Sequence, residues 1–361
     1  MDNPVSWEVA ERVATWVGAS GLGRAAAPAG LDDATWQQLR DDFAEATSRA
    51  EELVVAATGL RPASGTTRAQ VVDRAGWVRN NLSSFRHLLG PVLEELRTSP
   101  LSASMAGVTS RMTGVQLGAV LGWMSTRVLG QYDLLLAEGS AGDVVSYVGP
   151  NVVALERRNG FPPEQFRLWI ALHEVTHRCQ FTGVPWLHGH FLSLVDQALT
   201  GLRPDPRRFV EALRRAAGAA RSGQNPLGEA GVLGLVVPPE QLAVLRQIGA
   251  LMSLLEGHGD VTMDRAGAGA VAEADWFARA LRERRARVSG LARLLQQLSG
   301  IDAKMRQYEQ GERFIEQVEA AGGPSLLARV WEGPEALPTM DEIRHPEVWV
   351  DRMGPTRRAA G

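Results

Sequence analysis

His173-Glu174-Val175-Thr176-His177 places two imidazoles four residues apart, with a carboxylate beside the first. On a helix, residues at positions i and i+4 project from one face about 5 to 6 Å apart. Both rings can then reach one metal ion while Glu174 points towards a water on that ion. This HExxH pattern is typical of zinc hydrolases, and the alternative is a helix with two unrelated surface histidines.

The residues before the motif predict a buried helix. Apolar side chains recur at a helical rather than an alternating spacing, at Phe166, Trp169, Ile170 and Leu172. A Pro162-Pro163 start and an end near Gly183 predict a helix of about 18 residues. Two histidines and a glutamate are costly to bury without partners, and a metal ion removes that cost. We therefore favour the zinc-site interpretation.

The bulk composition fits a folded protein that does not bind nucleic acid. The chain has 361 residues, 45% of them hydrophobic, and a formal net charge of −3. This length allows two domains or one large one, and the charge argues against nucleic acid as the main partner. The single cysteine, Cys179, excludes an internal disulfide and a cysteine-based zinc site. We interpret Cys179 as a buried structural thiol.

Neither a membrane span nor a secretion signal is expected. The longest apolar region runs from Met105 to Leu129. It contains glycines at four-residue spacing, Gly114, Gly118 and Gly122. In lipid this spacing would suggest helix pairing, but Arg111 and other polar residues interrupt the region, so we expect a buried core helix. Polar residues also break any apolar run at the amino terminus, and a cytoplasmic location is the default expectation.

The chain is expected to contain an N-terminal helical region, residues 1–130, and a metal-binding region, residues 131–353. A tail follows at residues 354–361, and the whole is expected to form one compact unit. Asp32 and Asp33 predict the cap of a helix that runs to Thr58. The apolar spacing predicts a second helix from Arg68 to Arg97.

A small antiparallel sheet is predicted directly before the motif helix. Its strands are expected in short runs rich in β-branched residues, Tyr132–Ala137, Val144–Val148 and Val152–Glu156. Glycines and the Gly149-Pro150-Asn151 turn separate the runs. A loop is expected at residues 222–239. These patterns predict an α+β fold that is predominantly α-helical.

A catalytic zinc usually has three protein ligands, so a third donor must come from elsewhere in the chain. The longer pattern HExxHxxGxxH is absent, because Gln180 and Gly183 occupy its last two positions. We favour Glu256, at the end of a helical run that begins at Glu240, with His258 and His188 or His190 as the other candidates. Asp260, one turn later, is expected in the second shell, accepting the outer N–H of a ligating histidine. The alternative is that Glu256 and Asp260 merely cap a helix end.

Such a site supports hydrolysis. Zinc lowers the pKa of its bound water to about 7, and Glu174 is expected to remove a proton as that water attacks a carbonyl. The residue that stabilises the oxyanion is less clearly marked. Tyr308 is the first candidate, followed by His258 and His345, although a surface helix also explains the polar sequence around Tyr308.

Six segments together resemble the zincin-like metallopeptidase type 2 family, first catalogued as the domain of unknown function DUF2342. They are VVDRAGWVRNNLSSF at 71–85, GQYDLLL at 130–136, YVGPNV at 147–152, LHEVTHRCQF at 172–181, EGHGDVTMD at 256–264 and KMRQYEQG at 304–311. The first resembles most the actinobacterial branch labelled as associated with coenzyme F420 biosynthesis.

The resemblance implies a zincin-like, mostly helical fold with a small sheet beside the HExxH helix, and a Zn²⁺ cofactor. It implies metal-site roles for His173, Glu174 and His177, and for Glu256 by likeness to zincins whose third ligand is a glutamate on a later helix. The expected partners are peptides or small amides, and the leading hypothesis is a zinc-dependent peptidase or amidase.

Two other classes of function fit the sequence less well. One is a catalytically silent scaffold or binding protein whose zinc holds two helices together; Glu174 argues against it, since a structural site needs no base. The other is a flavin-type or F420-linked enzyme, for which the sequence has no GxGxxG after a strand.

Overall fold

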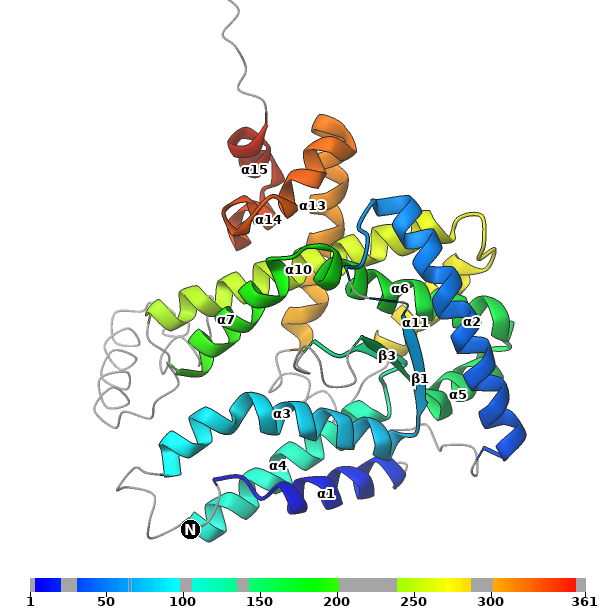
Figure 1. Cartoon of the computed structure of the whole chain (residues 1–361), viewed down its shortest axis with the longest axis vertical. Helices are drawn as coiled ribbons and strands as arrows, with labels where there is room; N and C mark the ends of the chain where they lie inside the picture. The colour runs from blue at the N-terminus through cyan, green and yellow to red at the C-terminus, as the bar shows by residue number, and fades with distance from the viewer. Residues whose placement is uncertain are drawn as a thin grey trace, which may run out of the picture. The chain divides into compact units, whose positions relative to one another are not determined.

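Helices make up most of the chain that the computed structural model describes, namely residues 4–20, 31–63, 65, 67–97, 106–134, 143–200, 239–286 and 301–354 (Figure 1). The α-helices are α1 (Trp7–Ala19), α2 (Asp33–Thr58), α3 (Arg74–Arg97), α4 (Ala106–Ser125), α5 (Gly149–Asn159), α6 (Pro163–Gly183), α7 (Leu187–Thr200), α10 (Pro239–Gly267), α11 (Ala274–Ala286), α13 (Ile301–Leu327), α14 (Met340–Arg344) and α15 (Pro346–Met353). The other elements are the 3-10 helices η2 (Ala328–Trp331) and η3 (Pro334–Ala336) and the strands β1 (Arg68–Val72), β2 (Gly130–Tyr132) and β3 (Val144–Val148). The predominantly helical α+β prediction is therefore confirmed. Residues 222–238 of the predicted loop and the tail after Gly354 lie outside the described residues, and Pro239, the last residue of that predicted loop, begins α10.

The second helix has the predicted bounds. The Asp32 carboxylate accepts a hydrogen bond of 2.8 Å from the backbone N–H of Thr35, which satisfies one of the free donors at the start of α2. Gly59 ends α2 in the left-handed region, with φ of 73°, where a residue without Cβ is favoured. Between these caps, α2 packs against α6 and β1.

The sheet is mixed, and the prediction of a purely antiparallel sheet is wrong. Its strand order is β1-β3-β2. β1 pairs in parallel with β3, from Arg68 opposite Val144 to Val72 opposite Val148, whereas β2 is antiparallel to β3. Parallel neighbours need a long connection, so β1 lies more than 70 residues before its partner, beyond the reach of any hairpin pattern.

Two element assignments are also corrected. Residues 68–72 form β1 rather than the start of the second predicted helix, which as α3 begins only at Arg74. Val152–Glu156 belongs to α5 rather than to a strand, because Gly149-Pro150-Asn151 starts a helix instead of a turn. Proline fits the first helical turn, where its missing N–H costs no hydrogen bond. Of the predicted strand Tyr132–Ala137, only Tyr132 lies in a strand, β2, which ends there; Asp133 and Leu134 are outside it, and residues 135–137 lie outside the described part.

The core beside the sheet is aromatic. The Tyr147 ring of β3 stacks on Phe43 of α2, with centroids 3.9 Å apart, and its hydroxyl is 2.8 Å from the Thr47 hydroxyl. Phe166 and Phe277, on α6 and α11, meet edge to face with centroids 5.2 Å apart. The first contacts fix β3 against α2, and the last fixes α6 against α11.

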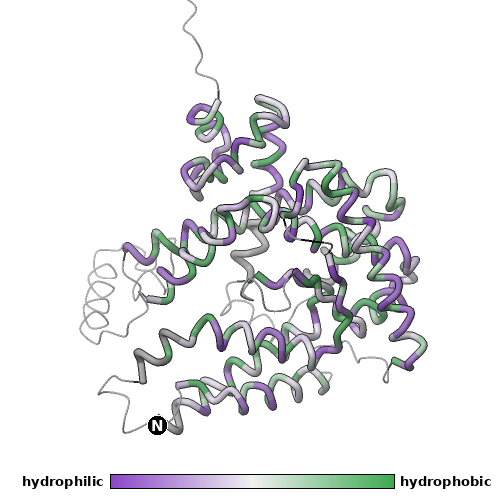
Figure 2. The backbone as a smooth tube through the Cα atoms, in the orientation of Figure 1, coloured by the Kyte–Doolittle hydropathy of each residue, from purple (hydrophilic) through white to green (hydrophobic). Residues whose placement is uncertain are grey.

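A glycine face joins α4 to α1. A Cβ added to Gly118 would lie 2.5 Å from the Ala10 carbonyl oxygen, and the same crowding recurs at Gly114 and Gly122. The expected helix is present, but only this face is buried: Met112 on α4 is 59% exposed. Within the described residues no helix is long and apolar enough to cross a bilayer, and Figure 2 shows hydrophilic positions interspersed along the helices.

The chain divides into two compact units, Met1–Pro185 with Leu255–Tyr308, and Trp186–Leu254 with Glu309–Gly361. The first holds the sheet, α6 and the later part of α10. In the second, the buried Trp349 indole donates to the Ala336 carbonyl at 2.8 Å and meets the Phe314 ring. These limits do not coincide with the predicted boundary at residues 130 and 131, and that domain organisation stays a prediction.

We predict that Gly118→Ala lowers the free energy of unfolding by about 1 to 3 kcal/mol, because the new methyl group must push α4 away from α1. The direction of the change tests the packing, because replacing glycine by alanine at an uncrowded helix position would raise the free energy of unfolding. Urea unfolding followed by circular dichroism measures the change. Met112→Ala, on the exposed face of the same helix, should change the value by less than about 0.5 kcal/mol. Stabilisation by Gly118→Ala would contradict the packing described.

Candidate metal centre

The motif helix α6 carries His173 and His177 on one face, as predicted. It begins at Pro163 after Pro162 and runs to Gly183. Its apolar residues are buried against α2, α5, α11 and the sheet. The two imidazoles, one turn apart, have ring centroids 4.7 Å apart and planes at 88° to each other. Their Nε2 atoms are 3.3 Å apart, so both rings direct the same nitrogen towards one point.

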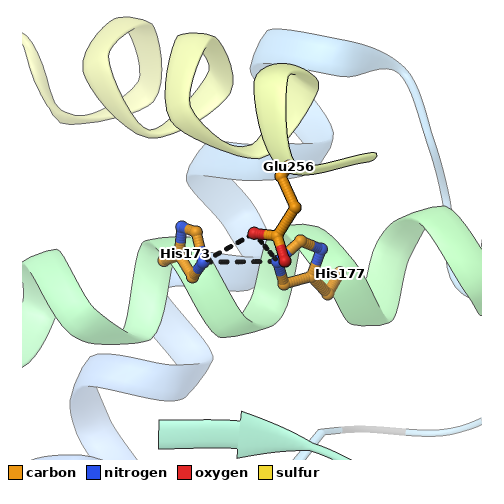
Figure 3. A group of neighbouring side chains, drawn as sticks. All are labelled: His173, His177 and Glu256. Atoms are coloured by element: carbon orange, nitrogen blue, oxygen red, sulfur yellow. Dashed lines mark hydrogen bonds and ion pairs between the residues drawn. The ribbon is translucent and has the colours of Figure 1, made fainter. Parts of the chain in front are cut away.

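Glu256 of α10 completes this group (Figure 3). Its Oε2 atom lies 3.7 Å from His173 Nε2 and 3.5 Å from His177 Nε2. Among the described residues, these three offer ligand atoms that all lie within 4.8 Å of one another. The suggestion that the acidic pair caps a helix end is wrong, because α10 continues through Gly257 and Gly259 to Gly267.

The α10 backbone lies over the two rings at Gly259. A Cβ added there would be 3.4 Å from His177 Cε1 and 3.7 Å from His173 Cε1. A larger side chain would therefore occupy the space beside the imidazoles. Two imidazole nitrogens and a carboxylate oxygen are a donor set that suits Zn²⁺, so the residues present fit the ion.

The charges around the rings favour a cation. Burial lowers the pKa of His177, but the hydrogen bond and charge of Glu256, the Glu174 charge and the Gln180 hydrogen bond outweigh it and raise the pKa to about 9. Asp260, one turn after Glu256, has its Oδ1 atom 3.6 Å from His173 Nδ1, on the side of the ring away from Glu256. Asp260 therefore lies within ion-pair distance of His173, and its role as the acceptor of the outer N–H stays a prediction.

Glu174 lies against the first residue of β2. A Cβ added to Gly130 would be 2.6 Å from Glu174 Cγ and 2.9 Å from its Oε1 atom, so the Glu174 side chain would have to move if this residue were larger. Burial raises the pKa of the Tyr147 phenol, the hydrogen bond to Thr47 lowers it, and the Glu174 charge raises it further. Both observations place the Glu174 side chain beside the sheet.

Arg178, the residue after the motif, was missed in the sequence. Its guanidinium is fully buried. Nε donates to Asp143 Oδ1 at 2.7 Å, and Nη2 donates both to Asp143 Oδ2 and, at 2.8 Å, to the Gly65 carbonyl, while Nη1 is 3.2 Å from Glu51 Oε2. Burial lowers the pKa of Arg178, but the bond and charge of Asp143 and the charge of Glu51 raise it overall. The sequence could have indicated its importance, because Arg178 is a charged residue inside a helix predicted to be buried.

The other candidate residues are not part of this group. His258 is buried on α10, with Nδ1 3.0 Å from Gln180 Nε2. His188 and His190 lie on α7, and His345 links α14 to α15, all in the second compact unit. The backbone of Tyr308 lies in α13, but its side chain is outside the described part of the structure. Its role in oxyanion stabilisation stays a prediction.

Comparison with known proteins identifies the family. The sequence profile of zincin-like metallopeptidases matches residues 5–350, nearly the whole chain. The chain belongs to the zincin-like metallopeptidase family. It is also similar to a crystal structure from Chloroflexus aurantiacus, described as a candidate hydrolase with a novel fold. That similarity has a TM-score of 0.70 and 32% sequence identity, and covers 97% of this chain and 98% of the other. Among curated proteins, none matches this sequence.

This zincin-like family suggests a zinc-dependent hydrolase, and a metal, typically zinc, is implied by it. The likeness to the Chloroflexus protein points in the same direction. The predictions of family and of a zincin-like, helix-dominated fold are thus confirmed.

We predict that Arg178→Met lowers the free energy of unfolding by about 3 kcal/mol, because Asp143 and Glu51 would remain partly buried without their cation. Urea unfolding in the presence of a chelator measures this without a contribution from metal. Arg12→Met is the matched control: Arg12 is 70% exposed at the side chain and pairs with Glu8 at 3.6 Å, so its loss should change little. Equal effects of the two substitutions would show that the Arg178 contacts do not stabilise the fold.

Proposed function

We propose that this zincin-like protein is a zinc-dependent hydrolase of amide bonds in peptides or small amides. The observation that carries the proposal is the convergence of His173, His177 and Glu256, whose ligand atoms all lie within 4.8 Å of one another. The helix that holds the two histidines also carries Glu174, whose charge acts on His177. Three protein ligands of this kind, with one coordination position left for water, are typical of catalytic rather than structural zinc.

The three ligands would be the Nε2 atoms of both histidines and a carboxylate oxygen of Glu256. Zinc, when bound, supplies Lewis-acid chemistry that lowers the pKa of a coordinated water to about 7 and polarises a substrate carbonyl. Asp260 would accept the Nδ1 proton of His173, 3.6 Å away, and so present the Nε2 lone pair of that ring to the ion. Asp260 acts in this way as a positioning residue.

Glu174 would be the general base that takes the proton of the attacking water on its carboxylate. Its position next to His173 in the sequence puts it on the neighbouring part of the α6 surface. The Gly130 backbone limits where the carboxylate can go, because any Cβ there would collide with it. A fixed base beside the metal is what proton transfer within hydrogen-bond reach requires.

Other expectations stay predictions beside this proposal. They are stabilisation of the oxyanion by Tyr308, a cytoplasmic location, the absence of a nucleic-acid partner and an association with coenzyme F420. The silent-scaffold alternative predicts the same zinc site without turnover, so the two proposals differ in what Glu174 does.

We predict that the purified protein binds one Zn²⁺ and that Glu256→Gln weakens binding by more than about 100-fold, a larger loss than changes in outer-shell partners cause. Calorimetric titration of the chelator-treated protein measures the affinity. Glu240→Gln, an exposed change at the start of the same helix, is the control and should leave the affinity unchanged. The zinc proposal fails if the wild-type protein binds no zinc.

We further predict that Glu174→Gln keeps zinc affinity within about tenfold of the wild type but lowers the rate of hydrolysis by about 10²- to 10⁴-fold, because the amide cannot accept the proton. Mass spectrometry of a mixed peptide library incubated with the zinc-loaded protein gives the readout. Turnover that survives the substitution would remove Glu174 from its role. Zinc binding with no turnover by the wild type in peptide and small-amide libraries would favour the scaffold.

A further inference from the structure

Gln180 lies one turn after His177 on α6 and is fully buried. We propose that Gln180 is a positioning residue that sets the tautomer of His177 and links it to α10. This inference rests on the proposed function, because it concerns how one of the proposed zinc ligands is held. In the sequence, Gln180 was notable only for occupying the glycine position of the longer HExxHxxGxxH pattern.

The orientation of the Gln180 amide follows from one contact. The Gln180 side chain is 3.0 Å from the backbone carbonyl of Leu255. A carbonyl oxygen can only accept, so the group facing it must be the Nε2 amide, which donates. The Oε1 atom then faces the opposite way, towards His177, where it is 2.9 Å from Nδ1. The fixed carbonyl of α10 therefore determines which end of the amide meets the imidazole.

The tautomer of His177 follows from the amide. Oε1 can only accept, so His177 Nδ1 must carry the proton and donate it. With Nδ1 protonated, the neutral ring has its lone pair on Nε2, the atom that lies 3.5 Å from Glu256 Oε2. This is the form of the ring that can bind a metal through Nε2.

His258 receives the second donation from Gln180. Its Nδ1 atom is 3.0 Å from Gln180 Nε2 and 3.4 Å from the Thr262 hydroxyl. Since the amide donates to it, His258 Nδ1 is an acceptor, and the neutral ring carries its proton on Nε2. His258 is thereby assigned to the support of the site, two residues after Glu256, rather than to the metal.

The two zinc-ligand candidates on α6 have different supports. His173 faces the Asp260 carboxylate, whereas His177 faces a neutral amide. A glutamate at position 180 could accept from His177 equally well, but its second oxygen would oppose the Leu255 carbonyl and could not donate to His258. Only a side chain with an acceptor and a donor at its end can join the three groups, and glutamine has this length and chemistry.

The test is zinc affinity, measured by calorimetric titration of chelator-treated wild-type protein and of Gln180→Met, which keeps the length but removes both polar atoms. We expect the variant to bind zinc 10- to 100-fold more weakly, the usual loss when an outer partner of a ligand is removed. Cys179→Ala, also a change at a fully buried position on α6 but outside the hydrogen-bonded group, should stay within threefold of the wild type. Equal zinc affinities of the wild type and Gln180→Met would overturn the proposed role of Gln180 but not the proposed function. A wild type that binds no zinc would overturn the proposed function itself.

A second measurement does not depend on the variant folding. Long-range ¹H–¹⁵N spectra of the zinc-loaded wild-type protein report which nitrogen of each histidine carries a proton. We expect a slowly exchanging proton on Nδ1 of His177 and a proton on Nε2 of His258. A zinc-loaded His177 protonated on Nε2, or a His258 protonated on Nδ1, would overturn the proposal. Where Gln180→Met folds, exchange of the His177 proton should be at least tenfold faster than in the wild type.

Discussion

The candidate site depends on the meeting of two imidazoles from α6 with one carboxylate from α10, some eighty residues later in the chain. These groups are costly to bury, and their attraction for one another or for a cation must offset that cost. Gly259 of α10 lies over both rings, where an added Cβ would be in van der Waals contact with each of them. The long α10 helix provides the carboxylate, this glycine and Asp260 within little more than one turn.

The sheet and its supports hold the other side of the site. Tyr147 of β3 is fixed by Phe43 and Thr47 of α2, while β2 brings Gly130 against Glu174. Arg178 joins α6 to Asp143, the residue before β3, and to Glu51 of α2. The proposed base therefore lies on α6 against β2, and these aromatic and ionic contacts fix the neighbouring strand β3 and α6 to α2. That rigidity is what a base must have if it is to stay within reach of a water molecule.

Local patterns in the sequence were enough to predict those elements whose formation depends on residues close together in the chain. The Asp32 cap, the HExxH helix and the helix carrying Glu256 follow from residues within one or two turns of each other. β1 was missed because its partner β3 is remote and its pairing is parallel. α5 was misread because a run of β-branched residues after a Gly-Pro-Asn sequence fits a strand as well as a helix. Arg178 and Gln180 could have been flagged as polar residues on a buried helix, but their partners are set by tertiary packing alone.

The polar groups of the candidate site all come from one compact unit of the chain. His173, Glu174, His177 and Gln180 belong to its first segment, and Glu256, His258 and Asp260 to its second, which resumes at Leu255. Leu255, whose carbonyl is the acceptor that orients Gln180, is therefore the first residue of the returning segment. The chain must come back to this unit in a defined register along α10, because a shift by one residue would rotate Glu256 about 100° away from the histidines. A buried hydrogen bond to that first carbonyl is well placed to define the register, since it is satisfied only when α10 is aligned with α6.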